Sequence, residues 1–166
     1  MHALASLKSR NRDKFRSRLK KHTMIKAEMS VVINRPVAGV FAFVTEPANH
    51  KKWQEGVIES RRLSSGPMGV GSQMAFVRKF LGRKVETKVE VTGYEPNKMF
   101  SAKTISGPLK FEMSQTYEPN GDGTEFSLGA QGEAGGFFKL AEGMVQKQMQ
   151  SQLEGDLQRI KKMLEG

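Results

Sequence analysis

The sequence predicts an α+β domain in which a run of antiparallel strands is followed by one long C-terminal helix. Between residue 56 and about residue 132, apolar and polar residues alternate in short runs that are separated by turns rich in glycine and proline. From Leu140 onward the apolar positions instead recur every three to five residues, which is typical of one face of a helix. Because the strands are grouped ahead of the long helix, we expect the α+β class.

The first strand is expected at residues 25–35, where β-branched residues mix with alternation, and Pro36 closes it. Proline suits a first helical turn because its missing N–H would have no partner there. A short amphipathic helix should follow and end before Pro47. Its apolar face would be formed by Val37, Val40, Phe41 and Val44. A second helical turn, PANHKKW, then leads to Trp53 at the start of the next strand.

Six further strands are expected before the long helix. Their segments are GVIESRRLS (56–64), SQMAFVRKF (72–80), KVETKVEVTGY (84–94), KMFSAKTISG (98–107), LKFEMSQTYE (109–118) and TEFSLGAQ (124–131). The segment at 84–94 alternates most regularly, with Val and Thr on one face and Lys and Glu on the other. That pattern is typical of a half-buried antiparallel strand with one solvated face.

The last element is a helix from about Leu140 to the end of the chain. At about 1.5 Å per residue it would be roughly 35–40 Å long, enough to span the domain. Gly143 and Gly155 lower its intrinsic helix propensity. We therefore expect tertiary packing to stabilise this helix, which should lie against the sheet.

The net charge of +10 is concentrated at the N-terminus. Residues 1–23 hold eight Lys or Arg and one Asp, a net of +7, whereas residues 24–166 hold nineteen Lys or Arg and sixteen Asp or Glu, a net of +3. We expect residues 1–23 to be a disordered basic extension and residues 24–166 to form one domain. Alternatives for residues 1–23 are an organelle transit peptide, an arm on anionic lipid or nucleic acid, or a segment upstream of a true start at Met24.

Composition also limits the location and the chemistry. No run of eighteen apolar residues occurs, which excludes a membrane-spanning helix on sequence grounds. The first residues lack the continuous apolar segment of a secretory signal, and the chain has no cysteine. Disulfides and thiol catalysis are therefore excluded, and we expect a cytoplasmic protein. A nucleic-acid partner is not expected, although residues 1–23 could contact an anionic membrane surface weakly.

The sequence offers no catalytic or metal-binding constellation. His2 and His22 lie in the basic extension, and His50 lies in a polar turn where we expect it to be solvated. No serine–histidine–aspartate arrangement is indicated, and no closely spaced Cys or His residues suggest a metal site. The glycines of residues 66–71 precede a strand and not a helix, so they are not a phosphate loop. We expect no cofactor, no metal and no catalytic residue.

An apolar, methionine-rich set of residues is expected on the inner face of the sheet and on the long helix. The sheet would contribute Met74, Phe76, Phe111, Met113 and Phe126, and the helix Met144 and Met149. These side chains could line an adaptable pocket for a hydrophobic ligand or fill a solid core.

The element order, together with five segments, resembles the START-like or SRPBCC superfamily, which includes pollen-allergen-like proteins, polyketide cyclases and coenzyme Q-binding proteins. The segments are INRPVAGVFAFVTEPANHKKW (33–53), GVGS (69–72), YEPNKMF (94–100), TYEPNGDGTEFSL (116–128) and the closing helix. The resemblance covers residues 24–166. It implies the helix-grip fold, a curved sheet of about seven strands around the long helix, with two short helices after the first strand. It also favours an internal cavity over a solid core.

Four polar or amphipathic residues complete the expected ligand-binding set. Trp53 could lie at the cavity rim or pack the corner between helix and strand. Arg78 would meet a carboxylate, reach the cavity mouth or bind an acidic ligand group. Tyr117 could donate to a ligand carbonyl, act as a weak acid or be a satisfied core residue, and Gln115 adds one donor and one acceptor.

Three functions remain open on this evidence. The first is non-enzymatic binding or transport of a lipid, quinone or polyketide-like molecule. The second is a cyclase or dehydratase that would use Tyr117 and Arg78 for proton transfer and positioning. The third is a protein-interaction module with an exposed apolar patch at a sheet edge. The oligomeric state is left open.

Overall fold

The computed structural model describes residues 24–80, 82–108, 110–133 and 142–166. The expected extension at 1–23 and the expected first residues of the long helix lie outside these ranges. The described elements are β1 (Met24–Ile33), α2 (Val37–Thr45), α3 (Pro47–Trp53), β2 (Val57–Arg62), β3 (Gln73–Phe80), β4 (Arg83–Glu95), β5 (Met99–Ser106), β6 (Phe111–Asn120), β7 (Gly123–Glu133) and α4 (Glu142–Glu165).

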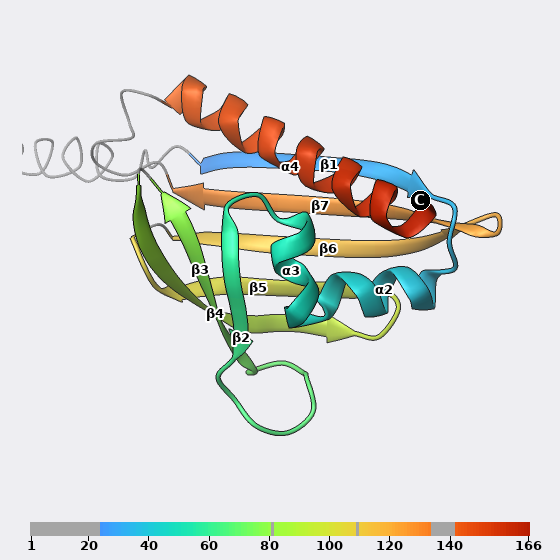
Figure 1. Cartoon of the computed structure of the whole chain (residues 1–166), viewed down its shortest axis with the longest axis horizontal. Helices are drawn as coiled ribbons and strands as arrows, with labels where there is room; N and C mark the ends of the chain where they lie inside the picture. The colour runs from blue at the N-terminus through green and yellow to red at the C-terminus, as the bar shows by residue number, and fades with distance from the viewer. Residues whose placement is uncertain (1–23, 81, 109, 134–141) are drawn as a thin grey trace, which may run out of the picture.

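One antiparallel sheet contains all seven described strands, in the order β1-β7-β6-β5-β4-β3-β2. The first strand pairs with the last, so β1 and β2 form the two edges. Helix α4 lies over β1 and β7, while α2 and α3 cover the middle of the same face (Figure 1). The helix-grip α+β fold predicted from the sequence is therefore confirmed.

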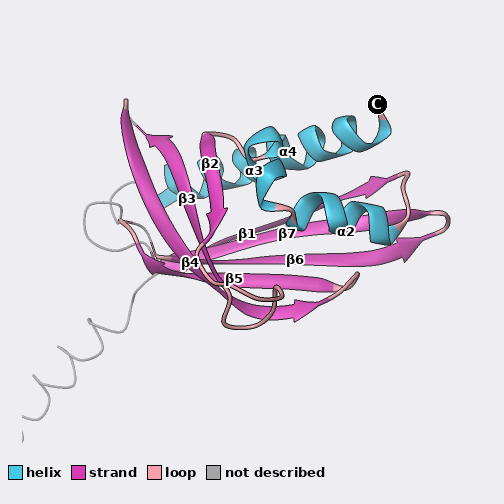
Figure 2. Cartoon of the chain, turned by 60° about the horizontal axis from the view of Figure 1, so that its bottom comes forward, coloured by secondary structure: helices cyan, strands magenta, loops and turns pink. Residues whose placement is uncertain are grey.

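The sheet is strongly curved, and β-bulges account for part of the bend. The register shifts between Val57 and Glu59 in β2, and twice in β4, between Lys88 and Val89 and between Val91 and Gly93. A bulge bends its strand and increases the local twist. Figure 2 shows the result, in which β2, β3 and one end of β4 turn up around α3.

Gly93 lies at the second bulge of β4. A Cβ atom at Gly93 would lie 2.5 Å from Ser101 Oγ and 2.8 Å from Met99 Cε on β5, closer than real Cβ contacts. The side chains of Ser101 and Met99 therefore occupy the space above Gly93, and a larger residue at this position would require them to move.

Two hydrophobic clusters fill the concave face. The first lies beneath α2, α3 and α4 and is built around the fully buried Phe126, Ile33 and Ile160. The second lies among β2–β5 and contains Met74 and Phe76. Tyr94 on β4 packs against both clusters, so it marks the boundary between them.

The expectation that Met144 faces the sheet is wrong, because its side chain is 76% exposed. The buried face of α4 is set by Leu157 and Ile160, with Leu153 packed beside them. At about 100° per residue, Met144 lies roughly 180° around the helix from Leu153. Apolar residues that recur every three to five positions do not define one helix face strictly, so the pattern included the exposed Met144 with the buried residues.

The expectation that His50 is solvated is also wrong. Its ring is only 4% exposed and stacks on Phe76 at a centroid distance of 5.2 Å. Nε2 lies 3.1 Å from the Val44 carbonyl oxygen in α2, and Nδ1 lies 2.8 Å from Ser60 Oγ in β2. Burial lowers the pKa of His50 from 6.5 to about 4, with the hydrogen bond to Val44 opposing that shift and the charge of Arg78 adding to it.

Hydrogen bonds also fasten α4 to the end of α3. Asp156, only 4% exposed, accepts from the backbone N–H of Glu55 at 3.0 Å and from Arg159. Arg159 Nε donates to the Trp53 carbonyl oxygen at 2.9 Å. The helix is thus held at its buried face by both apolar packing and charged groups whose hydrogen bonds are satisfied.

Truncating the buried face of α4 tests the assignment of that face. Leu157→Ala should lower the free energy of unfolding by about 2–5 kcal/mol, because it removes a fully buried side chain and leaves a cavity. Met144→Ala should change it by less than about 0.5 kcal/mol, because that position is exposed. Urea unfolding of both variants and the wild type measures the difference. Equal losses would contradict the orientation of α4.

The burial of His50 predicts a pH-dependent stability. The folded protein binds the second proton of the His50 ring more weakly than the unfolded chain does. The contribution of neutral His50 to the free energy of unfolding is therefore fully present above pH 6.5 and is lost as the pH falls toward 4. At 1.36 kcal/mol per pKa unit, His50 should account for about 3 kcal/mol of the fall in unfolding free energy over that interval. Urea unfolding of the wild type and His50→Gln at several pH values isolates this term. Identical pH profiles would contradict it.

Candidate functional site

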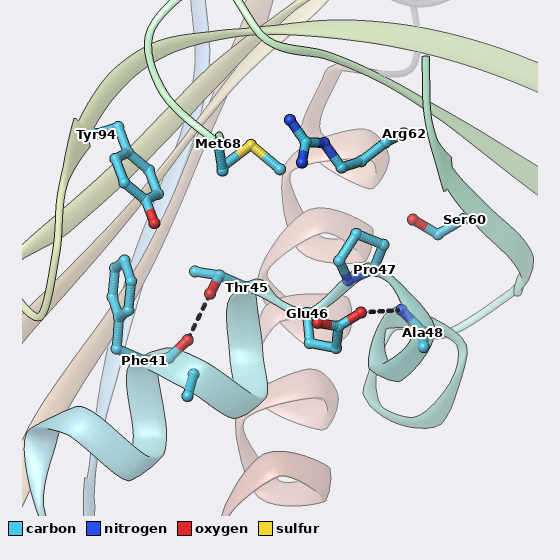
Figure 3. A pocket seen from close by; sticks show the side chains of 10 residues that line it. Phe41, Thr45, Glu46, Pro47, Ala48, Ser60, Arg62, Met68 and Tyr94 are labelled. Atoms are coloured by element: carbon cyan, nitrogen blue, oxygen red, sulfur yellow. Dashed lines mark hydrogen bonds between the residues drawn. The ribbon is translucent and has the colours of Figure 1, made fainter. Parts of the chain in front are cut away.

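A pocket of about 710 Å³ lies between the α2–α3 corner and strands β2 and β4, beneath the loop of residues 63–72. Its lining residues are Phe41, Ala42, Thr45, Glu46, Pro47, Ala48, Ser60, Arg62, Met68 and Tyr94. Figure 3 shows these side chains arranged around the pocket, with Tyr94 and Ser60 on opposite walls. No residue of α4 lines it.

Aromatic and methionine side chains form the apolar part of the wall. The ring of Phe41 lies 5.8 Å from that of Tyr94 and meets the buried Tyr117 edge-on at 5.0 Å. Met68 reaches in from the loop on the opposite side, as Figure 3 shows. These residues continue the two hydrophobic clusters, so the pocket is located where the clusters meet.

Arg62 supplies hydrogen-bond donors to the pocket. One Nη2 donor is used by the Gly66 carbonyl oxygen at 2.5 Å, within the loop of residues 63–72. Its Nε atom is buried and has no hydrogen-bond partner within the described residues. A ligand oxygen in the pocket would therefore have to accept from the Nη groups of the guanidinium, which carry a positive charge and only donate.

Ser60 and Tyr94 place hydroxyl groups at the pocket wall. Ser60 lies two residues before Arg62 on β2, so both side chains leave the same face of the strand. Ser60 Oγ is the hydrogen-bond partner of the buried His50. The Tyr94 hydroxyl points from β4 into the pocket (Figure 3).

Two further polar side chains at the rim serve the backbone. Thr45 Oγ1 donates to the Phe41 carbonyl oxygen at 2.7 Å near the end of α2. A Glu46 carboxylate oxygen accepts from the Ala48 N–H at 3.4 Å and caps α3. Ligand recognition is therefore best supplied by Ser60, Arg62 and Tyr94.

None of the eleven residues predicted from the sequence lines this pocket. Trp53, Tyr117 and Phe126 belong to the cluster beneath the helices, and Met74 and Phe76 belong to the other, with Met113 packed against it. Phe111 and Met149 are half-buried. Their role as ligand contacts, together with that of the exposed Met144, stays a prediction.

The polar members of the predicted set are engaged with protein groups. Arg78 donates to the Gln54 side-chain oxygen at 2.7 Å and to the Glu55 carbonyl at 3.1 Å, and burial lowers its pKa. The Tyr117 hydroxyl donates to Gln115 at 2.7 Å, and burial raises its pKa well above 10. Such a phenol is a poor proton donor to a ligand.

Trp53 is only 2% exposed, so it packs in the core and not at a rim. Its indole N–H has no hydrogen-bond partner within the described residues. Among the described residues, no group of three or more His, Asp or Glu side chains could hold a metal ion. No helix in the described ranges has the length and apolar character needed to cross a membrane.

Comparison with known proteins agrees with this architecture. The START superfamily protein from Mycobacterium smegmatis aligns with a TM-score of 0.70 at 17% identity, over 84% of this chain and 97% of its own. Ara h 8.0201 aligns with a TM-score of 0.67 at 13% identity, over 85% of this chain and 97% of its own. The di-domain ARO/CYC StfQ of the steffimycin biosynthetic pathway aligns with a TM-score of 0.73 at 14% identity, over 97% of this chain and 60% of StfQ.

At identities this low, the structural likeness shows the fold alone. A search of curated protein sequences finds no match. Residues 24–165, however, match the model of the family described as polyketide cyclase / dehydrase and lipid transport. The chain belongs to this family, within the START-like superfamily that the sequence motifs indicated.

Proposed function

We propose that this protein binds a hydrophobic or amphipathic small molecule in the pocket between α2–α3, β2 and the loop of residues 63–72. The observation that carries the proposal is a pocket of about 710 Å³ with apolar walls and three convergent polar side chains. Ligand pockets are commonly about 300–1,000 Å³ and have this mixed character. The family description, which includes lipid transport, supports the same class of ligand.

The polar groups favour a ligand that carries oxygen. Arg62 can only donate hydrogen bonds and carries a positive charge, so it suits a carbonyl or an acidic oxygen. The apolar side chains Phe41 and Met68 would contact the hydrocarbon part of the same ligand. Lipids, quinones and polyketide-like compounds all combine these two features.

The space between α4 and the sheet is the other candidate location. It is the place indicated by the eleven residues predicted from the sequence, among which Met149 is half-buried on α4. A substitution that fills one location should leave the other unchanged. Met68 and Met149 are therefore suitable positions for separating the two.

We expect Met68→Trp to weaken binding of the fluorescent probe 1-anilinonaphthalene-8-sulfonate at least tenfold, because the larger ring fills the pocket. Met144→Trp is the matched control, since that methionine is exposed. Met149→Trp should have little effect. Fluorescence titration of the three variants and the wild type measures the dissociation constants. A loss of affinity in Met149→Trp alone would move the site to the space between α4 and the sheet.

Native mass spectrometry of the protein purified from its own host provides a complementary measurement. A lipid, quinone or polyketide-like compound that co-purifies with the wild type, and not with Met68→Trp, would support binding in this pocket. Retention of the same compound by Met68→Trp would contradict the proposed location.

A cyclase or dehydratase is the second candidate function. The family description and the likeness to the di-domain ARO/CYC StfQ favour it. Such an enzyme needs a positioned proton donor or acceptor beside the reacting atoms. Tyr94, whose hydroxyl points into the pocket, meets that geometric requirement better than Tyr117, whose hydroxyl is bonded to Gln115.

If the protein is a cyclase, Tyr94→Phe should lower the turnover of a poly-β-ketone substrate by about 10²–10⁴-fold, the usual contribution of one general acid or base. Tyr117→Phe should have a much smaller effect on turnover. Chromatography of the cyclised product measures both rates. A wild type that binds the poly-β-ketone and leaves it unchanged would support simple binding.

We further propose that residues 24–166 carry the function in the cytoplasm, with the basic residues 1–23 as an extension that contacts anionic surfaces weakly. The absence of cysteine and the concentration of positive charge in residues 1–23 support this assignment.

A further inference from the structure

We propose that His50 fixes the hydrogen-bond polarity of the pocket, so that Ser60 acts only as an acceptor and the protein selects ligands that carry a hydroxyl donor beside an acidic or carbonyl oxygen. The expected ligand class is a hydroxylated aromatic or hydroxy-ketone compound. This inference rests on the proposed function and adds the chemistry by which the pocket chooses among amphipathic molecules.

The first step is the tautomer of His50. Its Nε2 atom lies 3.1 Å from the Val44 carbonyl oxygen, and a carbonyl can only accept a hydrogen bond. Nε2 must therefore carry the proton. The ring is 4% exposed and its pKa is lowered to about 4, so at neutral pH it holds no second proton. Nδ1 is consequently an acceptor.

The second step is the orientation of the Ser60 hydroxyl. Ser60 Oγ lies 2.8 Å from Nδ1, and since Nδ1 has no proton, Ser60 must donate its own. A hydroxyl has one proton and two lone pairs. Ser60 lines the pocket, so it presents only lone pairs to a ligand there.

The third step is the neighbouring donor. Arg62 lies two residues further along β2 and lines the same pocket, and its guanidinium group can only donate hydrogen bonds. Residues i and i+2 of a strand lie about 6.6 Å apart. A complementary ligand therefore needs a donor near Ser60 and an acceptor near Arg62, which a substituted two-ring aromatic compound can span.

A mismatched ligand should be rejected, and not merely bound without added affinity. An ether or carbonyl oxygen facing Ser60 would oppose lone pairs to lone pairs, and both groups would lose their hydrogen bonds to water. Sites built to bond a hydroxyl reject analogues that cannot form that bond. Tyr94 can both donate and accept, so it does not impose this selection.

The test uses 6-hydroxy-2-naphthoic acid and 6-methoxy-2-naphthoic acid, which differ only in the donor. Isothermal titration calorimetry at pH 7 should show at least tenfold tighter binding of the hydroxy compound by the wild type. In Ser60→Ala the two dissociation constants should become similar, whereas Ser101→Ala, a serine that bonds Thr92 away from the pocket, should keep the preference.

The variant His50→Phe provides the sharper measurement. Phenylalanine keeps an aromatic ring beside Phe76 but offers Ser60 no acceptor, so the Ser60 hydroxyl becomes free to donate to the methoxy oxygen. The ratio of the dissociation constants of the methoxy and hydroxy compounds should then fall toward one. Circular dichroism checks that the variant is folded. In the wild type, ¹⁵N-detected NMR of His50 should show a protonated Nε2 and a bare Nδ1.

The outcomes separate this inference from the proposed function. A wild type that binds both compounds equally, while Met68→Trp still weakens both, would overturn the selection and leave the pocket intact. A protonated Nδ1 at pH 7 would also overturn it. Failure of both compounds to bind at all, or binding unaffected by Met68→Trp, would overturn the proposed pocket itself.

Discussion

The hydrogen bonds of His50 are the constraint on which the pocket depends. One side chain in α3 bonds the Val44 carbonyl in α2 and the Ser60 hydroxyl in β2, while its ring stacks on Phe76 in β3. Of these four elements, α2, α3 and β2 contribute residues to the pocket wall. A neutral ring satisfies both hydrogen bonds, whereas a charged ring would place an unpaired charge in a buried position near the positive charge of Arg78. The geometry of the pocket is therefore tied to the protonation state of one buried side chain.

The position of the pocket follows from how the sheet bends. The bulges of β4 turn the strand near Gly93, and the next residue, Tyr94, packs against both hydrophobic clusters. The first cluster is covered by α2, α3 and α4, and the second lies among β2–β5, so each is enclosed by elements on its own side of Tyr94. The α2–α3 corner and the loop of residues 63–72 bridge that boundary from outside. The pocket is therefore an open depression at the junction of the two clusters, lined by residues of α2, α3, β2 and β4.

The sequence predicts the fold far better than it predicts the site. Alternation and helical spacing depend on local geometry, so every element was expected within a few residues of its observed bounds. Burial of a polar side chain depends on contacts from distant elements. His50 precedes two lysines and reads as solvated, yet α2, β2 and β3 enclose it. Strand β2, VIESRR, carries polar residues on both faces, so its alternation could not single out the face of Ser60 and Arg62 as a pocket wall.

Apolar patterning misplaced the site for a related reason. The longest apolar residues of the inner face, such as Phe126 and Met74, are the ones that fill a core, because their burial provides the most stabilisation. The pocket lies beside these clusters, and its polar wall residues Ser60 and Arg62 belong to neither of them. Selectivity in such a space arises from a few fixed polar atoms, since an unmatched buried donor or acceptor costs about 1–3 kcal/mol. A donor on Arg62 and an acceptor on Ser60 would in this way favour ligands with a complementary donor and acceptor over others that the apolar wall admits.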